Sequence, residues 1–550
     1  MVRRSRILLP FAALLTLLVA GDAAAATAWT TSPALMAQAR WMQASAQDAS
    51  GNTYVFGGLT GAFPFTPTTS AEKFDGTSWS AIKPLPARRA QFGAALGSDT
   101  NIYIVGGFNS SGVIVSTVYR YNPGTDSYQT VAALPTPRSG AAVVADQSGL
   151  IYAIGGSPPG ANLAVARVDR YNPGTNTWTQ VASLPSPRSD GEAVLGADGD
   201  IYYFGGVTNT AVGGSFARRT VMHYDTTGNT WSTLPVSTPT FEAFNAAAQL
   251  HGLIYLMGAE ANLKGQTVVN SFDPTSNTWT CVDPLPAGRA WQTADTRGDT
   301  LESIGGAASS GHPVRSVFQL ALDATDTTAP FVRTAPTPSL VGGSTVTSTA
   351  VPVRLSWKAC DNGSSLDSYT VEQSEDGGAT WTPVAPATQL STTVVQSFAP
   401  SGSVIRQARM SATDSAANTS APVAGRAYTV RLFGDGASAS VRYAGTWHIG
   451  VSANYLGGRD HYATSTASSV TLHFTGRQVG WVASKLPISG SARVYADGHL
   501  LGTVSLHASS GQPRKITFTH LWANSGAHTL KIVPAATGKR IDVDGFALLG

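Results

Sequence analysis

Five arginines recur at corresponding places in a repeated stretch of this 550-residue chain. Most of them come shortly after a Leu-Pro pair, as in LPTPR, LPSPR and LPAGR. A guanidinium can bind a carboxylate or a sulfate through two parallel hydrogen bonds. If the repeats surround a central channel, these arginines would form an anion-binding site at the opening of the channel. The alternative is a structural role, in which neighbouring backbone carbonyls hold each side chain. The series is Arg40, Arg88, Arg138, Arg188 and Arg289.

Acidic residues follow the arginine position in two neighbouring repeats. Because side chains alternate along a strand, residues two and four places after the arginine share its face. Asp190 and Glu192 stand at these places after Arg188, and Glu242 stands four places after Thr238, which replaces the arginine in the fifth repeat. Paired carboxylates can act as general acid and base on sugars, which makes these three the candidate catalytic residues. The alternative is that they neutralise the arginines or are solvated in a wet channel.

A second candidate site lies near the C-terminus, where aromatic residues cluster around a glycine-rich stretch. Aromatic faces stack on sugar rings, and polar neighbours can fix the sugar hydroxyls. The run Asp460 to Tyr462 is expected to be exposed, whereas the alternative places these aromatics in a core. The candidate carbohydrate-binding set is Trp447, Tyr455, Arg459, Asp460, His461 and Tyr462.

No metal site and no cofactor is expected. The histidines of the repeated stretch (His223, His251 and His312) have no ligand spacing, and there is no zinc-type cluster of Cys and His. The two cysteines are Cys281 and Cys360. A disulfide between them would fix the angle between two domains, but two separate buried thiols are the favoured alternative, because two cysteines give no spacing pattern.

The elements that would position these residues come from a repeat of nearly fifty residues. Glycine pairs mark its copies, and their first members lie 49, 49, 50, 53 and 47 residues apart. Short apolar runs such as NIYIVGG, bounded by Gly, Pro and Asn, predict four antiparallel strands per copy. Glycine suits a strand end that another backbone approaches closely. The pairs begin at Gly57, Gly106, Gly155, Gly205, Gly258 (followed by Ala259) and Gly305.

This pattern resembles the kelch repeat, through its Gly-Gly pairs, its spaced Tyr and Trp and its period. The resemblance covers residues 27–323 and implies a β-propeller, whose blades are four-stranded sheets. The aromatic anchors are offset from the glycine pairs, so we expect an N-terminal strand at TAWTTSPAL to complete the last of six blades. The anchors are Trp29, Trp79, Tyr128, Trp178, Trp231 and Trp279.

Two further all-β units are predicted after the repeats. Residues 324–432 resemble a fibronectin type III or immunoglobulin-like sandwich, with Trp357 in the core. Residues 433–550 resemble the galactose-binding-like jelly rolls of secreted bacterial proteins, above all in the ending DVDGFALL. The expected roles are a spacer and a glycan-binding or packing module.

Residues 1–26 have the pattern of a secretory signal peptide, with early arginines, an apolar run and then small residues. The apolar run is about 14 residues, shorter than the roughly 20 of a spanning helix. The formal charge of the whole chain is only +3, which argues against a nucleic-acid partner. We therefore expect a secreted, extracellular bacterial protein without a membrane span.

The preferred functional hypothesis is a non-enzymatic, monomeric binding protein, whose propeller is a platform for an extracellular glycan or protein. The alternative is an enzyme acting on a sugar acid in the channel mouth, because the repeats are similar to exported six-bladed kelch rings, the sialic-acid mutarotases. Copper chemistry like that of galactose oxidase is disfavoured, since Cys281 lies in an outer-strand segment far from the channel.

Overall fold

The computed structural model describes residues 29–550 apart from 62–63, 161–162, 211–213, 262–263, 323–324, 387 and 437–438. The predicted signal peptide, residues 1–26, lies outside the described residues. Apart from one 3-10 turn at Leu456–Gly458, the regular structure described is β-strand, which confirms the all-β class. Among the described residues, no helix is long and apolar enough to cross a membrane.

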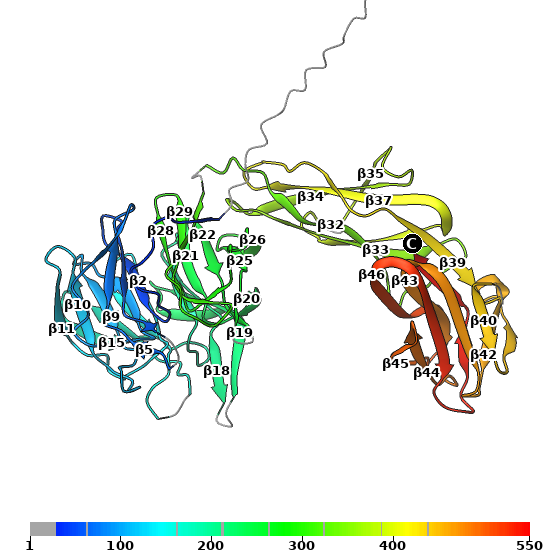
Figure 1. Cartoon of the computed structure of the whole chain (residues 1–550), viewed down its shortest axis with the longest axis horizontal. Helices are drawn as coiled ribbons and strands as arrows, with labels where there is room; N and C mark the ends of the chain where they lie inside the picture. The colour runs from blue at the N-terminus through cyan, green and yellow to red at the C-terminus, as the bar shows by residue number, and fades with distance from the viewer. Residues whose placement is uncertain are drawn as a thin grey trace, which may run out of the picture.

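The repeated stretch folds into six antiparallel sheets, which form the left-hand body in Figure 1. Their second strands, such as TYVF and IYIV, are buried along their whole length, because apolar side chains on both faces meet the neighbouring sheets. In order from the innermost strand outward, the first three sheets are β2 (Ala44–Gln47), β3 (Thr53–Phe56), β6 (Ala71–Phe74) and β7 (Trp79–Ala81); β8 (Gly93–Leu96), β9 (Ile102–Val105), β10 (Val118–Asn122) and β11 (Ser127–Val131); and β12 (Ala142–Ala145), β13 (Ile151–Ile154), β14 (Val168–Asn172) and β15 (Thr177–Gln180).

The last three sheets follow the same order, and the sixth takes its outer strand from the N-terminus. That strand pairs with β31 through Thr30 and Gln319. The sheets are β16 (Glu192–Leu195), β17 (Ile201–Phe204), β19 (Gly214–Asp225) and β20 (Thr230–Glu242), with β18 (Val207–Thr210) added to β19; β21 (Ala246–Leu250), β22 (Leu253–Met257), β25 (Val269–Asp273) and β26 (Thr278–Cys281); and β28 (Thr293–Arg297), β29 (Thr300–Ile304), β31 (Val317–Ala321) and β1 (Thr30–Thr31). Short loop pairs are β4 (Leu59–Thr60) with β5 (Thr66–Pro67), β23 (Glu260–Ala261) with β24 (Lys264–Gly265), and β27 (Arg289–Ala290) with β30 (Ala307–Ala308).

A closed circle of backbone hydrogen bonds joins the six sheets at their inner edge. One residue just before each innermost strand donates its N–H to the carbonyl of the equivalent residue in the preceding sheet, over 2.7 to 3.1 Å. All six have left-handed backbone, with φ between 54° and 62°. We call this set the central ring. It consists of Met42, Gln91, Gly140, Asp190, Phe244 and Trp291.

The repeated glycine pairs lie where one sheet approaches the backbone of the next. A Cβ at Gly106 would lie 2.5 Å from the carbonyl oxygen of Arg138, and the N–H of Gly107 donates to that same oxygen over 2.8 Å. Gly155 makes the same approach to Arg188, where a Cβ would lie 2.3 Å from the carbonyl oxygen. These contacts confirm the expectation that glycine is placed by a close backbone approach.

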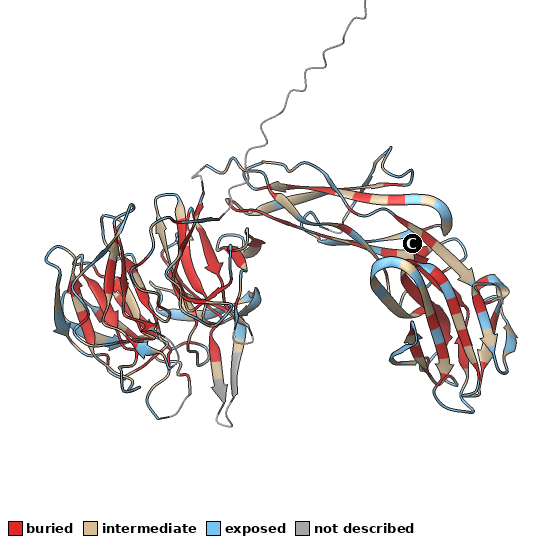
Figure 2. Cartoon of the chain, in the orientation of Figure 1, coloured by how far each residue is buried: buried red, intermediate tan, exposed pale blue. Residues whose placement is uncertain are grey.

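The chain after the repeats forms the elongated right-hand body of Figure 1, whose buried residues alternate along its strands in Figure 2. Two smaller sheets contain β32 (Phe331–Leu340), β33 (Val351–Cys360) and β36 (Thr393–Phe398), and β41 (His448–Val451), β42 (Arg459–Ala463) and β47 (Ile541–Val543). The large sheet contains β35 (Thr382–Val384), β34 (Leu366–Ser374), β37 (Ser401–Asp414), β39 (Tyr428–Gly434), β48 (Gly545–Leu549), β43 (Ser469–Lys485), β46 (Gln512–Pro534), β44 (Ser491–Ala496) and β45 (His499–Ser505), with β38 (Val423–Ala424) beside β37 and β40 (Val441–Ala444) beside β43.

The large sheet runs through both predicted C-terminal units. Strand β39 pairs with β37 on one side and β48 on the other, so the predicted boundary between residues 432 and 433 falls inside this strand. One apolar cluster likewise combines Trp357 with Val482 and Leu549. The two units therefore share a sheet and part of a core.

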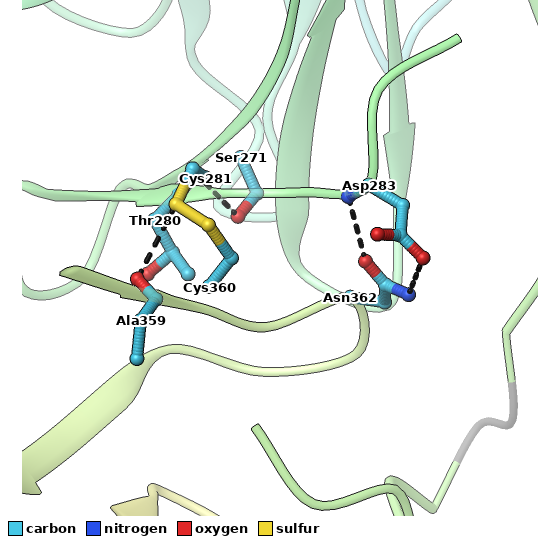
Figure 3. The surroundings of a disulfide bond; sticks show 7 residues. All are labelled: Ser271, Thr280, Cys281, Asp283, Ala359, Cys360 and Asn362. Carbon is cyan, nitrogen blue, oxygen red and sulfur yellow. Dashed lines mark hydrogen bonds between the residues drawn. A yellow bond between two sulfur atoms is a disulfide. The ribbon is translucent and has the colours of Figure 1, made fainter. Parts of the chain in front are cut away.

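A disulfide joins the repeated stretch to the body that follows it. Cys281 at the end of β26 is bonded to Cys360 at the end of β33, with their Cα atoms 4.7 Å apart (Figure 3). The expectation of two separate thiols is therefore wrong: strands 79 residues apart in sequence come side by side, which spacing alone does not reveal. Beside the bond, the backbone N–H of Asp283 donates to Asn362 Oδ1 over 2.9 Å.

We expect a proteolytic digest of the unreduced protein to contain one peptide pair linked through Cys281 and Cys360. The double variant Cys281→Ser/Cys360→Ser should unfold at a lower urea concentration, because closing a loop of this length removes about 4 kcal/mol of chain entropy from the unfolded state. Reductant should shift the unfolding of the wild type and leave that of the variant unchanged. Two titratable thiols in the denatured, unreduced wild type would contradict the bond.

Candidate functional site

The repeated arginines are buried within the sheets and bind backbone carbonyls of their own sheet. Arg138, which has no exposed surface, donates to the carbonyls of Gly155 and Arg167 over 3.0 and 2.9 Å and pairs with Asp169. Arg40 makes the equivalent set of contacts and pairs with Glu72. This is the structural alternative, and it corrects the expectation that these guanidinium groups are available to a ligand at the channel mouth.

Arg188 and Arg289 are also buried, but they have different partners. Arg188 donates to Thr220 Oγ1 over 3.0 Å, and the guanidinium of Arg289 lies 4.2 Å from the ring centre of Phe318. Burial lowers the pKa of Arg289 to about 10. A buried guanidinium requires several acceptors. For Arg188 and Arg289 these are the carbonyl of the preceding residue and a hydroxyl group of the same sheet.

In the second repeat the buried arginine is Arg89, not Arg88. Arg89 donates to the carbonyls of Gly106 and Thr117 over 3.2 and 2.9 Å and lies over the Tyr119 ring, whereas Arg88 is exposed. The spacing identifies the right residue, because the arginine stands three places after the proline of Leu-Pro in LPTPR, LPSPR and LPAGR as well.

Inside the central ring the innermost strands enclose a cavity of about 350 Å³. Residues of all six sheets line it, and three of them are carboxylic acids: Asp190, Glu192 and Asp295. None of the described lining residues is Lys, Arg or His. The structure thus places Asp190 and Glu192 in the channel, while the side chain of Glu242 lies outside the described residues.

The cavity environment disfavours ionisation of its carboxylic acids. Burial, followed by the neighbouring charge of Asp295, raises the pKa of Glu192 to about 8. Burial also raises the pKa of Asp295 to about 7 and that of Asp190 to about 6, although Gln91 Nε2 donates to Asp190 Oδ1 over 2.5 Å. Near neutral pH the cavity therefore holds both protonated and ionised carboxyl groups.

Asp295 was missed in the sequence, although the alternation of strand side chains could have identified it. It stands six places after Arg289, one step further along the channel face than the position of Glu192 after Arg188. Two polar neighbours in the cavity lining, Asn245 and Thr293, have side-chain atoms with no hydrogen-bond partner among the described residues.

Two aromatic residues, Phe244 and Trp291, line the cavity, and further aromatic side chains extend from Trp291. The sequence did not indicate this cluster. The rings of Phe244 and Trp291 are stacked, with centroids 3.7 Å apart, and Trp41 meets Trp291 edge to face at 6.0 Å. Phe65 packs against Trp41 at 5.1 Å. Trp291 Nε1 donates to Glu260 Oε2 over 2.9 Å, which fixes the indole. We call the four residues Trp41, Phe65, Phe244 and Trp291 the aromatic rim.

Most of the C-terminal candidate residues are held by residues outside the candidate set. Arg540 donates to Tyr455 Oη and Asp460 Oδ2 over 3.2 and 2.9 Å and lies over the ring of Tyr462. Asp460 is fully buried, which corrects its expected exposure, and burial together with the neighbouring Asp542 raises its pKa.

The remaining C-terminal candidates lie around Tyr443. His461 stacks on this ring at 4.6 Å and shares a 2.6 Å hydrogen bond with Asp435, while Trp447 meets the ring edge to face. Arg459 is 58% exposed and has its closest carboxylate oxygen, on Asp435, 3.9 Å away. Most of the candidate side chains thus contact Arg540, Tyr443 or Asp435.

The raised pKa values of the cavity carboxyl groups predict a stability that falls with rising pH. Because its pKa is raised, Glu192 binds a proton more tightly in the folded chain; this stabilisation is complete below pH 4.5 and is lost as the pH rises through about 8. One such proton changes the free energy of unfolding by at most about 1.4 kcal/mol per pH unit. Calorimetry between pH 5 and 8 should show a declining unfolding temperature that Glu192→Gln flattens.

The control for this titration is Asp367→Asn, which removes an exposed carboxylate of the C-terminal body. It should leave the pH dependence of the wild type unchanged. An identical slope in Glu192→Gln and the wild type would show that this carboxyl group ionises normally.

Two protein-family models match parts of the repeated stretch. The model of the KLHDC2/KLHL20/DRC7 Kelch-repeats domain matches residues 129–306, and that of the Kelch motif matches residues 89–135. The solved chain titled "Structure of YjhT" aligns over 52% of this chain and 95% of its own, with 21% identity and a TM-score of 0.44.

Curated relatives match short segments. Beta-scruin of Limulus polyphemus is 34% identical over 112 residues, which are 19% of this chain and 12% of the relative. Two Flavonifractor plautii proteins also match: A type blood alpha-D-galactosamine galactosaminidase, 34% identical over 105 residues (19% and 10% of the two chains), and A type blood N-acetyl-alpha-D-galactosamine deacetylase, 27% identical over 116 residues (21% and 15%). The chain thus spans between 10% and 15% of these relatives. With the sheets and their glycine pairs, the family matches show that the chain contains a kelch-repeat β-propeller segment.

Proposed function

We propose that this is a secreted, monomeric carbohydrate-binding protein, whose binding site is the aromatic rim and the cavity beneath it. In this proposal the kelch segment is a six-bladed propeller, and the C-terminal body is an accessory module of two sandwiches. The observation that carries the proposal is the set of stacked aromatic rings at the entrance of a cavity lined with carboxyl groups.

The rim has the two chemical features that sugar recognition uses. Aromatic faces take the C–H side of a sugar ring, and Trp291 and Phe244 are held rigidly by the central ring and by Glu260. Below them, the carboxyl groups and the unpaired polar atoms of Asn245 and Thr293 are available to hydroxyl groups. A left-handed backbone at bulky residues such as Trp291 is the kind of strain that gathers at functional sites.

The charge of the cavity selects among sugars. Asp190 and Asp295 would repel a sugar acid, and no basic side chain among the described lining residues would bind its carboxylate. A neutral sugar or an amino sugar, whose ammonium group complements the carboxylates, fits this lining. Two of the Flavonifractor plautii relatives are named for galactosamine substrates, which supports the amino sugar as the first ligand to test.

An enzymatic role on the same sugars is the second candidate. It is favoured by the contrast between Glu192, whose pKa is raised to about 8, and Asp190, whose pKa is raised only to about 6, in the same cavity. Such a pair can supply a general acid and a base. Under this candidate, Glu192→Gln would abolish turnover of a bound sugar and leave its affinity in place.

Secretion is part of the proposal and agrees with the disulfide, because an oxidising compartment is where such bonds form and persist. The signal-peptide pattern of residues 1–26 supports the same location.

Calorimetric titration of the whole protein with galactosamine, galactose and sialic acid tests the proposal. We expect binding of the amino sugar or the neutral sugar and none of the acid. Phe65→Ala, which removes an aromatic ring outside the central ring, should weaken binding about tenfold, or about 1.4 kcal/mol. Trp381→Ala removes an aromatic residue of the C-terminal body and should have no effect. Equal affinities in the two variants, or selective binding of sialic acid, would refute the rim as the site.

A further inference from the structure

We propose that Asp326, Asp361 and Asp414 form a calcium-binding site at the junction between the propeller segment and the body that follows it. The proposal concerns a region separate from the channel and does not depend on the proposed function. The three residues come from different segments: the connection before β32, the residue after β33 and the last residue of β37.

The geometry of the three carboxylates suits one cation of calcium's size. Each residue offers one oxygen, and these oxygens all lie within 4.8 Å of one another. Because Ca²⁺ binds oxygen at about 2.3 to 2.6 Å, two oxygens bound to one ion lie at most about 5 Å apart, and the spacing of the three oxygens is within this limit. The set contains neither nitrogen nor sulfur, which favours a hard cation over zinc or copper.

An unsatisfied buried carboxylate points independently to a ligand. Asp361 is only 1% exposed, and its Oδ1 has no hydrogen-bond partner, as is also true of the buried Oδ2 of Asp326. The other oxygen of Asp361 accepts the N–H groups of Gly363 and Ser364 over 3.1 and 2.6 Å, which fixes the carboxylate. Leaving a buried ionised oxygen without a partner is costly unless a cation is bound nearby.

No basic side chain forms an ion pair with these three carboxylates among the described residues. Burial, together with the charges of Asp326 and Asp414, raises the pKa of Asp361 to about 7. Asp414 instead accepts two hydrogen bonds from Asn418, at 2.8 and 3.0 Å, which hold its carboxylate in place. A divalent cation would offset the mutual repulsion of the three groups.

The site lies directly beside the contacts that join the two bodies. Asp361 follows Cys360 of the disulfide, and its N–H donates to the carbonyl of Cys281 over 3.0 Å. Tyr255 of β22 donates to the carbonyl of Asn362 over 2.9 Å, and Figure 3 shows Asn362 against Asp283. Calcium at Asp361 would therefore hold the connection before β32 and the ends of β33 and β37 against the propeller segment.

A second acidic group, Asp198, Asp200 and His223, serves as an internal comparison. It also brings its ligand atoms within 4.8 Å, but Asp198 is exposed and His223 shares a 2.8 Å hydrogen bond with Asp200. Its polar atoms are satisfied within the protein, so we assign no ion to it.

The test is calorimetric titration of the whole, chelator-treated protein with CaCl₂, together with thermal unfolding with and without 5 mM CaCl₂. We expect one saturable site with a dissociation constant on the order of 0.1 to 1 mM, as in extracellular calcium modules, and a higher unfolding temperature in calcium. Asp361→Asn keeps the shape of the side chain and removes its charge. It should weaken calcium binding at least tenfold and remove the calcium-dependent shift.

Matched variants separate this site from other carboxylates. Asp367→Asn, an exposed change six residues away, and Asp200→Asn, in the comparison group, should bind calcium like the wild type. Without calcium, Asp361→Asn should unfold at or above the wild-type temperature, because repulsion is relieved; if it does not fold, Asp326→Asn takes its place. Absence of calcium binding at 5 mM, unchanged binding in the junction variants, or its loss in Asp200→Asn would overturn the proposal.

Discussion

The central ring of backbone hydrogen bonds is the constraint on which the propeller segment depends. Each of its six N–H groups donates to the carbonyl of the preceding sheet, so no sheet can tilt or slide without breaking two of them. The bond requires a left-handed backbone at every position, including Met42, Phe244 and Trp291, where this conformation costs roughly 1 to 2 kcal/mol. The ring therefore accepts local strain in return for closure, and it points bulky side chains at the rim of the cavity.

The arginines and the glycine pairs support this ring from the outside. The guanidinium groups of Arg40, Arg89 and Arg138 bind carbonyls at the strand ends of their own sheets. The backbone carbonyl of each buried arginine also accepts the N–H of a residue at the glycine-pair position in the preceding sheet. This contact between neighbouring sheets therefore recurs along the repeats. The residues around it differ from sheet to sheet, and they determine the chemistry of the cavity. Carboxyl groups appear only in some sheets, as at Glu192 and Asp295, which makes the cavity acidic on a ring built from similar units.

The sequence predicted the all-β class, the glycine-pair approach, the N-terminal outer strand and the channel position of Asp190 and Glu192, because these follow from periodicity along single strands. It did not predict what depends on distant segments. Nothing in the sequence indicates that the carbonyls of Gly155 and Arg167 accept hydrogen bonds from Arg138. Likewise, the aromatic rim brings Phe65 and Trp41 together with Trp291, which lies 250 residues after Trp41 in the chain. The disulfide and the shared strand β39 were missed for the same reason, since both join parts of the chain that the sequence treats as separate.

The exchange of the backbone amides in the central ring tests the account most directly. If the ring closes the propeller segment, the amides of Met42, Gln91, Asp190, Phe244 and Trp291 exchange with deuterium only when the whole segment unfolds. The amides of surface turns, such as Ser50 and Thr77, provide the fast reference. Protection of the ring amides equal to that of the innermost strands is the predicted result. Exchange as fast as in the surface turns would contradict a closed ring and, with it, a rigid rim at the mouth of the cavity.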